Sequence, residues 1–270
     1  MHDEDWVTEF HRISDLVRSA VAPLLGTAEG RRELGQGAGG DRTVLLDQVA
    51  EDRVIEELRT LARRGNPCTV LSEEVGEVDL GAPYPRVFVD PVDGSLNAKF
   101  GVPLSAVMLS LLDGPDLGDI RVGVVQNLVS GERWHAIRGG GAFHDGTRVT
   151  MRPHSSTRIQ VLGVEGNPRQ LETVWPLIRS ASKLRAMGSI ALSLAFTATG
   201  AYDVFCSPKH TGRAFDMTAG MLMVKEAGGV ITDLSGRRLE GDRAGLHDGS
   251  ALLAAPTREA HTLALERLAG

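Results

Sequence analysis

The sequence predicts a layered α/β protein built on mixed sheets. In both halves of the 270-residue chain, segments with helical periodicity alternate with short runs of strand-forming residues. Several of these runs end abruptly in acidic residues, at the kind of strand end where α/β proteins place polar loops. Hydrophobic residues make up 42% of the chain, enough for one large domain or two intimate subdomains. We expect two subdomains, at 1–155 and 156–270.

Two amphipathic helices are expected in the first half, at 5–25 and 47–64. In the second of them, Val54, Leu58 and Leu61 share one face because they recur at helical spacing. Strands are expected where apolar and β-branched residues form short runs between turn signals. These runs lie at 69–71, 86–90, 105–112, 122–128, 133–137 and 148–151, the last three forming an antiparallel meander.

The segment 29–41, between the two helices, is rich in glycine and formally matches G-x-G-x-x-G. A dinucleotide-binding turn of this kind must follow a strand, but charged residues stand where that strand should be. We therefore interpret the segment as a mobile surface loop rather than a nucleotide site.

The second half repeats the alternation of strands and helices. An apolar helix is expected from Gly188-Ser189 to Thr199, and Gly228-Gly229 is expected to close a helix at 214–227 with a left-handed cap. The remaining elements are strands at 158–164, 202–206, 230–232 and 250–254, and helices at 168–182 and 257–268.

Composition argues against several classes of protein. The net charge of −6 is unlike a general nucleic-acid binder, which would show a basic face. No run approaches the roughly 18 uninterrupted apolar residues of a transmembrane helix, and the acidic start at 1–5 is unlike a signal peptide. Two cysteines fit a reducing compartment, and no zinc-binding Cys/His spacing occurs. We expect a cytoplasmic protein with neither nucleic-acid nor membrane partners.

The stretch 87–95, Val-Phe-Val-Asp-Pro-Val-Asp-Gly-Ser, holds the first candidate site. An apolar strand ends on Asp90, the following proline prevents further ladder hydrogen bonding, and Asp93 comes next. Two carboxylates about 4 Å apart would repel by roughly 4 kcal/mol at an effective dielectric near 20, so a cation must separate them or one must be protonated. Oxygen ligands favour magnesium, manganese or calcium over zinc, and the amides of Gly94 and Ser95 suit a phosphate. An ordinary Asp-Pro turn is the alternative.

Further acidic residues lie at strand ends or helix starts, namely Asp47, Glu73-Glu74 and Asp216. Each has a structural interpretation of its own. Asp47 and Asp216 could cap helix N-termini, and the glutamate pair could form a solvated turn.

These acidic motifs follow one another in a recognisable order. They are Glu73-Glu74, Asp90-Pro91-Val92-Asp93-Gly94-Ser95 and Asp216-x-x-Ala219-Gly220. With this order the chain resembles the inositol monophosphatase superfamily, which includes lithium-sensitive, magnesium-dependent inositol monophosphatases and fructose-1,6-bisphosphatases. Stretches at 122–131, 136–143 and 187–192 resemble its archaeal-type branch. The resemblance implies an αβαβα five-layer sandwich that forms a homodimer or homotetramer.

The resemblance also implies a set of site residues. Two or three Mg²⁺ ions, for which Mn²⁺ could substitute, would be held by Glu73, Asp90, Asp93, Asp216 and the carbonyl of Val92. Catalytic roles would fall to Asp47, Glu73 and Ser95, with Asp47 and Ser95 orienting the attacking water. Ser95 stands where threonine is commoner, a change that keeps the hydroxyl. The substrate side would be formed by Asp93, Gly94, Ser95, Gly188, Ser189 and Ala191.

Two stretches depart from the family pattern. Many archaeal-type members have a lysine directly after the threonine at position 43, where this chain has Val44. Animal inositol monophosphatases place a glutamate seven residues before the metal aspartate, a spacing that Lys209 holds here. With Arg185 and Arg213, Lys209 could favour a second phosphate on the substrate, although surface salt bridges are an equal alternative.

The resemblance therefore implies a phosphoric monoester hydrolase that uses a metal-activated water. Phosphate monoesters are anions that repel hydroxide, and divalent cations offset that repulsion. Inositol 1-phosphate and fructose 1,6-bisphosphate are the first candidate substrates, with histidinol phosphate and 3′-phosphoadenosine 5′-phosphate as alternatives. A catalytically silent relative that only binds a phosphorylated metabolite is an alternative of another class. Such a relative should have lost a metal ligand or the activating hydroxyl, and all are present here.

Overall fold

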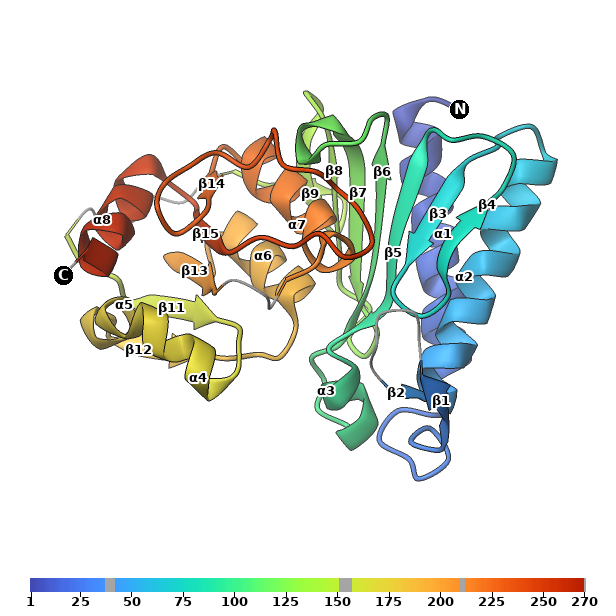
Figure 1. Ribbon diagram of the computed structural model, residues 1–270, viewed down its shortest axis with the longest axis horizontal. Coiled ribbons are helices and arrows are strands. Elements are labelled where there is room, and N and C mark those ends of the chain that lie inside the picture. Colours follow the sequence, from blue (N-terminus) through green and yellow to red (C-terminus); the bar gives the residue numbers. More distant parts are fainter. Residues whose placement is uncertain (37–41, 151–156, 209–211, 270) are drawn as a thin grey trace.

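The computed structural model describes residues 1–36, 42–150, 157–208 and 212–269, and Figure 1 shows their arrangement. Two β-sheets lie side by side, with helices between them and on their outer faces. The boundary expected between residues 155 and 156 falls outside the described residues, so the division into subdomains stays a prediction. No helix in the described ranges is both long enough and apolar enough to cross a membrane.

Helices form three of the five layers. Helices α1 (Asp3–Val21) and α2 (Leu45–Arg63) cover the outer face of the larger sheet. Helices α6 (Ile190–Ala198) and α7 (Ala214–Glu226) fill the space between the sheets. Helix α8 (Arg258–Ala269) covers the outer face of the second sheet, together with the short helices in the segment 168–180. The expected αβαβα sandwich is therefore confirmed.

The larger sheet has eight strands in the order β10-β9-β8-β7-β6-β5-β3-β4. They are β3 (Thr69–Ser72), β4 (Gly76–Asp79), β5 (Arg86–Asp93), β6 (Ala106–Leu112), β7 (Ile120–Asn127), β8 (Arg133–Ile137), β9 (Gly141–His144) and β10 (Thr147–Arg148). Strands β3 and β5 are parallel neighbours, and the other neighbouring pairs described in this sheet are antiparallel. Because parallel strands end at the same edge of a sheet, β3 and β5 bring their last residues together.

The second sheet has five strands in the order β12-β11-β13-β15-β14. They are β11 (Val161–Val164), β12 (Lys183–Arg185), β13 (Val204–Ser207), β14 (Val230–Thr232) and β15 (Leu252–Ala255). Strand β11 is parallel to both β12 and β13, and β15 is antiparallel to both β13 and β14. The remaining elements are the hairpin β1 (Glu33–Gln36) and β2 (Arg42–Val44), the short helices α3 (Ser95–Phe100), α4 (Pro168–Leu171) and α5 (Trp175–Ser180), and the 3₁₀ turns Leu117–Asp119 and Glu172–Val174.

Side chains alternate between the two faces of each buried strand. In β5, Val87 and Val89 pack against the layer of α1 and α2, whereas Phe88 belongs to the core formed with α6 and α7. In β13, Phe205 belongs to that same central core and Val204 packs on the side of α8. The central strands of both sheets are buried on both faces, which explains why β3, β5, β6, β7, β13 and β15 are nearly continuous hydrophobic runs.

The prediction of a single helix at 168–182 is wrong. The segment forms α4, a 3₁₀ turn and α5, and then joins the second sheet as β12. Pro176 lies in the first turn of α5. Proline lacks the amide hydrogen that a continuous helix needs and its ring clashes with the preceding turn, so the helix must restart there.

Several strands differ from expectation, β5 in its boundary and others in being present at all. Strand β5 continues through Pro91 to Asp93, with an irregular register against β6 between Asp90 and Asp93, so the proline interrupts the ladder without ending the strand. Strands β4 and β9 were not expected, because β4 is a largely polar edge strand and β9 begins on Gly141. Part of the segment interpreted as a loop, Glu33–Gln36, pairs with β2. The expectation of a mobile loop otherwise concerns residues 37–41, which lie outside the described residues.

The sequence leaves open whether His135 and His144 face solvent or each other; both are half-buried, and each stacks on a different aromatic ring. The ring of His135 stacks on Phe143 and lies 3.1 Å from Nε2 of His11 through its Nδ1. The ring of His144 stacks on Trp134 with 4.8 Å between centroids, while its Nε2 approaches two surface carboxylates. Both histidines therefore belong to aromatic contacts on the surface of the larger sheet.

Candidate metal centre and substrate cavity

Glu73 and Asp90 come together because β3 and β5 are parallel. Ser72, the last residue of β3, pairs with Val89 of β5. The next residues in each strand are Glu73 and Asp90, and the Glu73 amide donates a hydrogen bond to the Val89 carbonyl at 3.3 Å. The pairing register alone thus sets two carboxylates side by side at one edge of the sheet.

Asp216 reaches the same place from the central helical layer. It lies in the first turn of α7, where its Oδ2 accepts a hydrogen bond from the Arg213 amide at 2.7 Å. Glu73, Asp90 and Asp216 each present one oxygen, and these oxygens lie within 4.8 Å of one another. Two unit charges at such a separation repel by about 3 kcal/mol at an effective dielectric near 20. The arrangement is unfavourable unless a cation or protons compensate it.

Burial strengthens this repulsion. Asp90 is 2% exposed, and Asp93 and Asp216 are each 7% exposed. Burial, followed by the charges of Glu73, Asp93 and Asp216, raises the pKa of Asp90 well above its usual value. Burial and the charge of Asp216 raise the pKa of Asp93 to about 7. Without a cation, these carboxyls therefore retain protons under conditions in which exposed aspartates are ionised.

Asp93 is held by the start of helix α6. Its Oδ2 accepts hydrogen bonds from the Ser189 hydroxyl and, at 2.8 Å, from the Ala191 amide, while the Ile190 amide lies 3.3 Å from Oδ1. This is the favourable N-terminal end of a helix for a negative charge. These contacts join the end of β5 to the start of α6 in the central helical layer, although Asp93 and Ser189 lie 96 residues apart in the sequence.

Arg213 brings a cation into direct contact with the carboxylate cluster. Its guanidinium forms an ion pair with Glu73 and lies over the ring of Phe215, 4.7 Å from the centroid. Arg213 was predicted to bind substrate, and the structure places its side chain against a predicted metal ligand.

The clustered carboxylates line a cavity of about 240 Å³. Of the predicted residues it is lined by Glu73, Asp90, Val92, Asp93, Gly94, Ser95, Gly188, Ser189, Arg213 and Asp216. Asp47, Arg185 and Ala191 are outside this lining. Arg185 is exposed on β12, and the amide of Ala191 is committed to Asp93. Lys209 lies outside the described residues.

Asp47 and Ser95 have separate partners. Asp47 Oδ2 lies 3.2 Å from Lys99 Nζ, and burial, partly offset by Lys99, raises the pKa of Asp47. The Ser95 hydroxyl donates to the Val92 carbonyl at 3.0 Å. No hydrogen bond joins Asp47 to Ser95 in the described part of the chain, so their shared role in orienting a water stays a prediction.

Two buried glutamates beside the site were not expected. Glu165 follows β11 and lines the cavity; its Oε1 accepts hydrogen bonds from the Met187 and Gly188 amides and from the Ser193 hydroxyl, at 2.9, 3.0 and 3.0 Å. Glu51 of α2 is 2% exposed and accepts a hydrogen bond at 2.6 Å from the hydroxyl of Ser72, the residue before Glu73. An acid at a strand end is the signal that singled out Asp90, and Glu165 carries it too.

Comparisons with known proteins agree with this geometry. The model of the inositol monophosphatase family matches residues 8–269. A fructose-1,6-bisphosphatase/inositol-1-monophosphatase of Methanothermobacter thermautotrophicus is 32% identical over 95% of this chain and 94% of its own length. A protein of the same description from Thermococcus kodakarensis is 34% identical over 82% of this chain and 80% of its own.

A solved structure has the same fold. It is a hypothetical protein from Pyrococcus horikoshii with similarities to inositol-1 monophosphatase, with a TM-score of 0.83 over 98% of this chain and 99% of its own, at 24% identity. Sequence, family pattern and fold agree over nearly the whole length of the chain. The chain belongs to the inositol monophosphatase family.

Proposed function

We propose that this protein is a Mg²⁺-dependent phosphomonoesterase that hydrolyses a small sugar or polyol phosphate. The observation that carries the proposal is the convergence of Glu73, Asp90 and Asp216, from two strands and a helix, on one small buried volume. Gathering three carboxylates in one place is unfavourable unless cations or protons offset their charge, and a divalent cation would do so beyond the ion pair that Arg213 makes with Glu73.

The residues fit a divalent metal. Their donors are carboxylate oxygens and the Val92 carbonyl, which suit Mg²⁺ or Mn²⁺ better than softer ions. We assign Glu73, Asp90, Val92, Asp93 and Asp216 as the ligands of two or three ions. When bound, the ions supply positive charge that neutralises the phosphate, lowers the pKa of water and stabilises the leaving oxygen.

The chain's own groups position the substrate. The amides of Gly94 and Ser95, where β5 gives way to α3, would donate to the phosphate oxygens. Gly188 and Ser189 line the cavity next to Gly94 and would contact the polyol. Asp47, Glu73 and the Ser95 hydroxyl would orient the attacking water and accept its proton.

Substrate choice follows from the charge around the cavity. The relatives named above are described as acting on fructose 1,6-bisphosphate and inositol 1-phosphate. Arg213 lines the cavity here. It would favour a second phosphate on the substrate, as in fructose 1,6-bisphosphate, whereas Arg185 lies outside the lining. The descriptions of the relatives support inositol 1-phosphate as well, so we place these two substrates ahead of histidinol phosphate and 3′-phosphoadenosine 5′-phosphate.

A phosphate-release panel tests the proposal. Purified protein is assayed against these four esters, with and without Mg²⁺, and we expect release from at least one only when Mg²⁺ is present. No release from any of them would reject the proposal. Calorimetric binding without hydrolysis would support the silent relative instead.

The variant Asp93→Asn tests the assigned centre. It keeps the shape of the side chain but removes its charge, so we expect kcat at saturating Mg²⁺ to fall roughly a thousandfold, equivalent to about 4 kcal/mol. Asp52→Asn, on the exposed face of α2, is the matched control and should keep normal turnover. Near-normal kcat in Asp93→Asn would show that the assignment of this residue is wrong.

Location, assembly and inhibition complete the proposal. The free thiols of Cys68 and Cys206 are both buried, as suits a cytoplasmic protein. We propose a homodimer or homotetramer, to be checked by analytical ultracentrifugation, and inhibition by Li⁺, to be checked in the same phosphate-release assay.

A further inference from the structure

A second cavity lies at the other end of α7 from Asp216. It has a volume of about 450 Å³, larger than the carboxylate-lined cavity, and is bounded by α7, β14 and α8. Lys225, in the last turn of α7, lines it. Residues 216 to 225 of a helix span about 14 Å along its axis, so the two cavities are separate sites.

The charged side chains in this lining are mostly cationic. Lys225, Arg238 and Arg258 come from three different segments, and Glu240 is the carboxylate among the lining residues. Lys225 Nζ lies 3.1 Å and Arg238 Nη2 3.6 Å from the same Glu240 oxygen. One carboxylate therefore faces two cations, and Arg258 adds a third positive charge in a protein whose net charge is −6.

A buried histidine adds a fixed polar group to the same wall. His261 is 5% exposed, and its Nε2 lies 2.8 Å from the Thr232 hydroxyl oxygen. That hydroxyl donates its hydrogen to the Asp233 carbonyl at 2.7 Å, so it must accept from Nε2–H of the ring. Burial and the nearby charge of Arg258 lower the pKa of His261.

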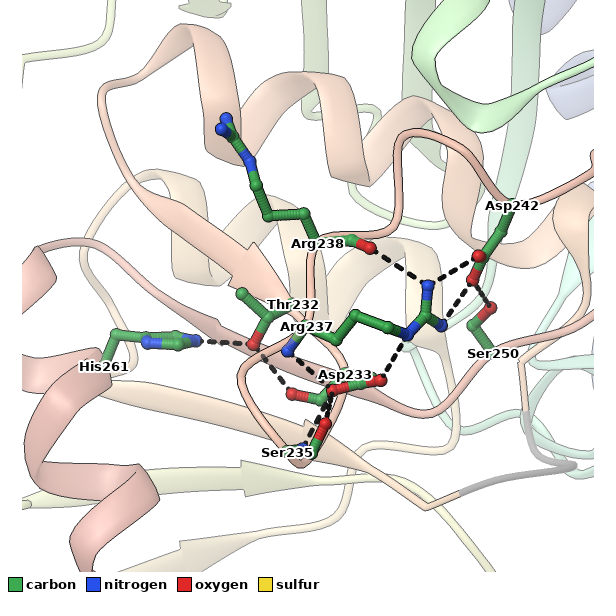
Figure 2. Close-up of polar contacts among 8 residues, drawn as sticks. All are labelled: Thr232, Asp233, Ser235, Arg237, Arg238, Asp242, Ser250 and His261. Carbon is green, nitrogen blue, oxygen red and sulfur yellow. Dashed lines mark hydrogen bonds and ion pairs between the residues drawn. The ribbon is translucent and has the colours of Figure 1, made fainter.

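The loop that carries Arg238 and Glu240 is held rigid from behind. Figure 2 shows Arg237 turned toward Asp233 and Asp242, whereas the guanidinium of Arg238 points away from them. Arg237 donates to Asp233 Oδ2 at 3.0 Å and to the two oxygens of Asp242 at 2.7 and 2.8 Å. A bidentate pair of this kind fixes orientation as well as distance. Arg237 therefore holds the loop in place, whereas Arg238 lines the cavity with a side chain that is 83% exposed.

We propose that this second cavity binds a small phosphorylated compound carrying at least two phosphate groups. Cations from three segments converge on it, which a single phosphate would not satisfy, and guanidinium groups match phosphate oxygens in geometry. Its volume is that of a small-molecule site. The proposal does not depend on the activity proposed above.

Isothermal titration calorimetry with inorganic pyrophosphate tests the site. The protein is first dialysed free of divalent ions, because ions bound in the carboxylate-lined cavity would themselves bind pyrophosphate and add to the measured heat. We expect one pyrophosphate to bind per chain. The double variant Arg238→Gln, Arg258→Gln should bind at least about tenfold more weakly, since it removes two charge-assisted contacts.

Arg267→Gln is the matched control. It removes one positive charge from an exposed position of the same helix α8, away from the cavity lining, and should bind as the wild type does. The imidazole ¹⁵N resonances of His261 should shift during the titration. Absence of binding heat in the wild-type protein, equal affinity in the double variant, or an unmoved His261 resonance would each overturn the proposal.

Discussion

Two carboxylates hold the start of α6 from opposite sides. Asp93 accepts from Ser189 and Ala191, and Glu165 accepts from the Gly188 amide with both of its oxygens, each at 3.0 Å. Glu165 is 7% exposed, and burial raises its pKa. Because the backbone between these contacts lines the cavity, we propose that Glu165 positions the substrate side of the site rather than binding a metal ion.

We expect Glu165→Gln to raise KM much more than it lowers kcat. The amide nitrogen of glutamine would face hydrogen-bond donors, leaving at least one buried partner unsatisfied at a cost of about 1–3 kcal/mol. Gly188 and Ser189 would then shift, while Glu73, Asp90 and Asp216 would keep their positions. Steady-state kinetics on the substrate identified in the phosphate-release panel measures the change.

Glu172→Gln serves as the control for Glu165, because Glu172 is an exposed residue of the neighbouring 3₁₀ turn. Its KM and kcat should equal those of the wild type. A Glu165→Gln variant with unchanged KM would show that the loop is held adequately without this carboxylate.

Helix α7 approaches its neighbours through the small residues of the motif Asp216-x-x-Ala219-Gly220. A Cβ added to Gly123 of β7 would lie 2.7 Å from the Cα of Ala219, and one added to Gly220 would lie 2.4 Å from the Cβ of Leu194 of α6. The aspartate of the motif therefore faces the candidate metal centre, while its last two residues allow the close packing that brings the aspartate there.

The junction between β5 and α3 depends on close backbone approach. Gly94 has φ +82°, and an added Cβ would lie 2.8 Å from the Gly188 carbonyl oxygen and 2.9 Å from that of Leu104. We expect Gly94→Ala to destabilise the protein by about 2–4 kcal/mol, through left-handed strain of about 1–2 kcal/mol and the displaced backbone. Urea unfolding measures the change, and activity should fall with it.

Comparison with Gly146→Ala separates the stability lost to left-handed backbone strain from the stability lost to steric crowding. Gly146 has φ +75°, close to that of Gly94, but no atom lies within 4 Å of an added Cβ. The free energy of unfolding of this variant should fall only by the cost of left-handed strain, about 1–2 kcal/mol, and its activity should be unchanged. Equal losses in both alanine variants would contradict the importance of the contact with Gly188.

The whole molecule should respond to pH through its buried acids. The pKa values of Asp93 and Glu51 are raised to about 7, chiefly by burial, and that of Asp90 is raised well above normal. Such groups bind more protons when folded than when unfolded. The free energy of unfolding of the metal-free protein must therefore fall as pH rises from about 4 to above 7.

Urea unfolding at pH 5 and pH 8 measures this effect. We expect the metal-free protein to be less stable at pH 8, by an amount on the order of 2 kcal/mol. Saturating Mg²⁺ should reduce the loss because it binds the ionised folded form, and Asp93→Asn should reduce it because one titrating group is gone. Stability that rises with pH in the metal-free protein would refute this account of the cluster.

Local sequence patterns predicted much of this protein. Helical periodicity predicted α1 and α2, the glycine pair at 228–229 predicted the end of α7, and acids at strand ends singled out Glu73, Asp90 and Asp93. The resemblance to the inositol monophosphatase superfamily then predicted the five-layer fold. The sequence predicts these features because periodicity, turn residues and short motifs depend only on residues that are close together in the chain.

Only the tertiary structure decided which of these residues meet. The parallel register of β3 and β5 places Glu73 beside Asp90, and the packing of α7 brings Asp216 to them. The same packing places Asp47 beside Lys99, Arg213 beside Glu73, and Glu165 beside the backbone that leads into α6. Partners such as these are separated by tens of residues, and no local pattern encodes them, because their distance depends on how whole layers stack and on which small residues let them approach.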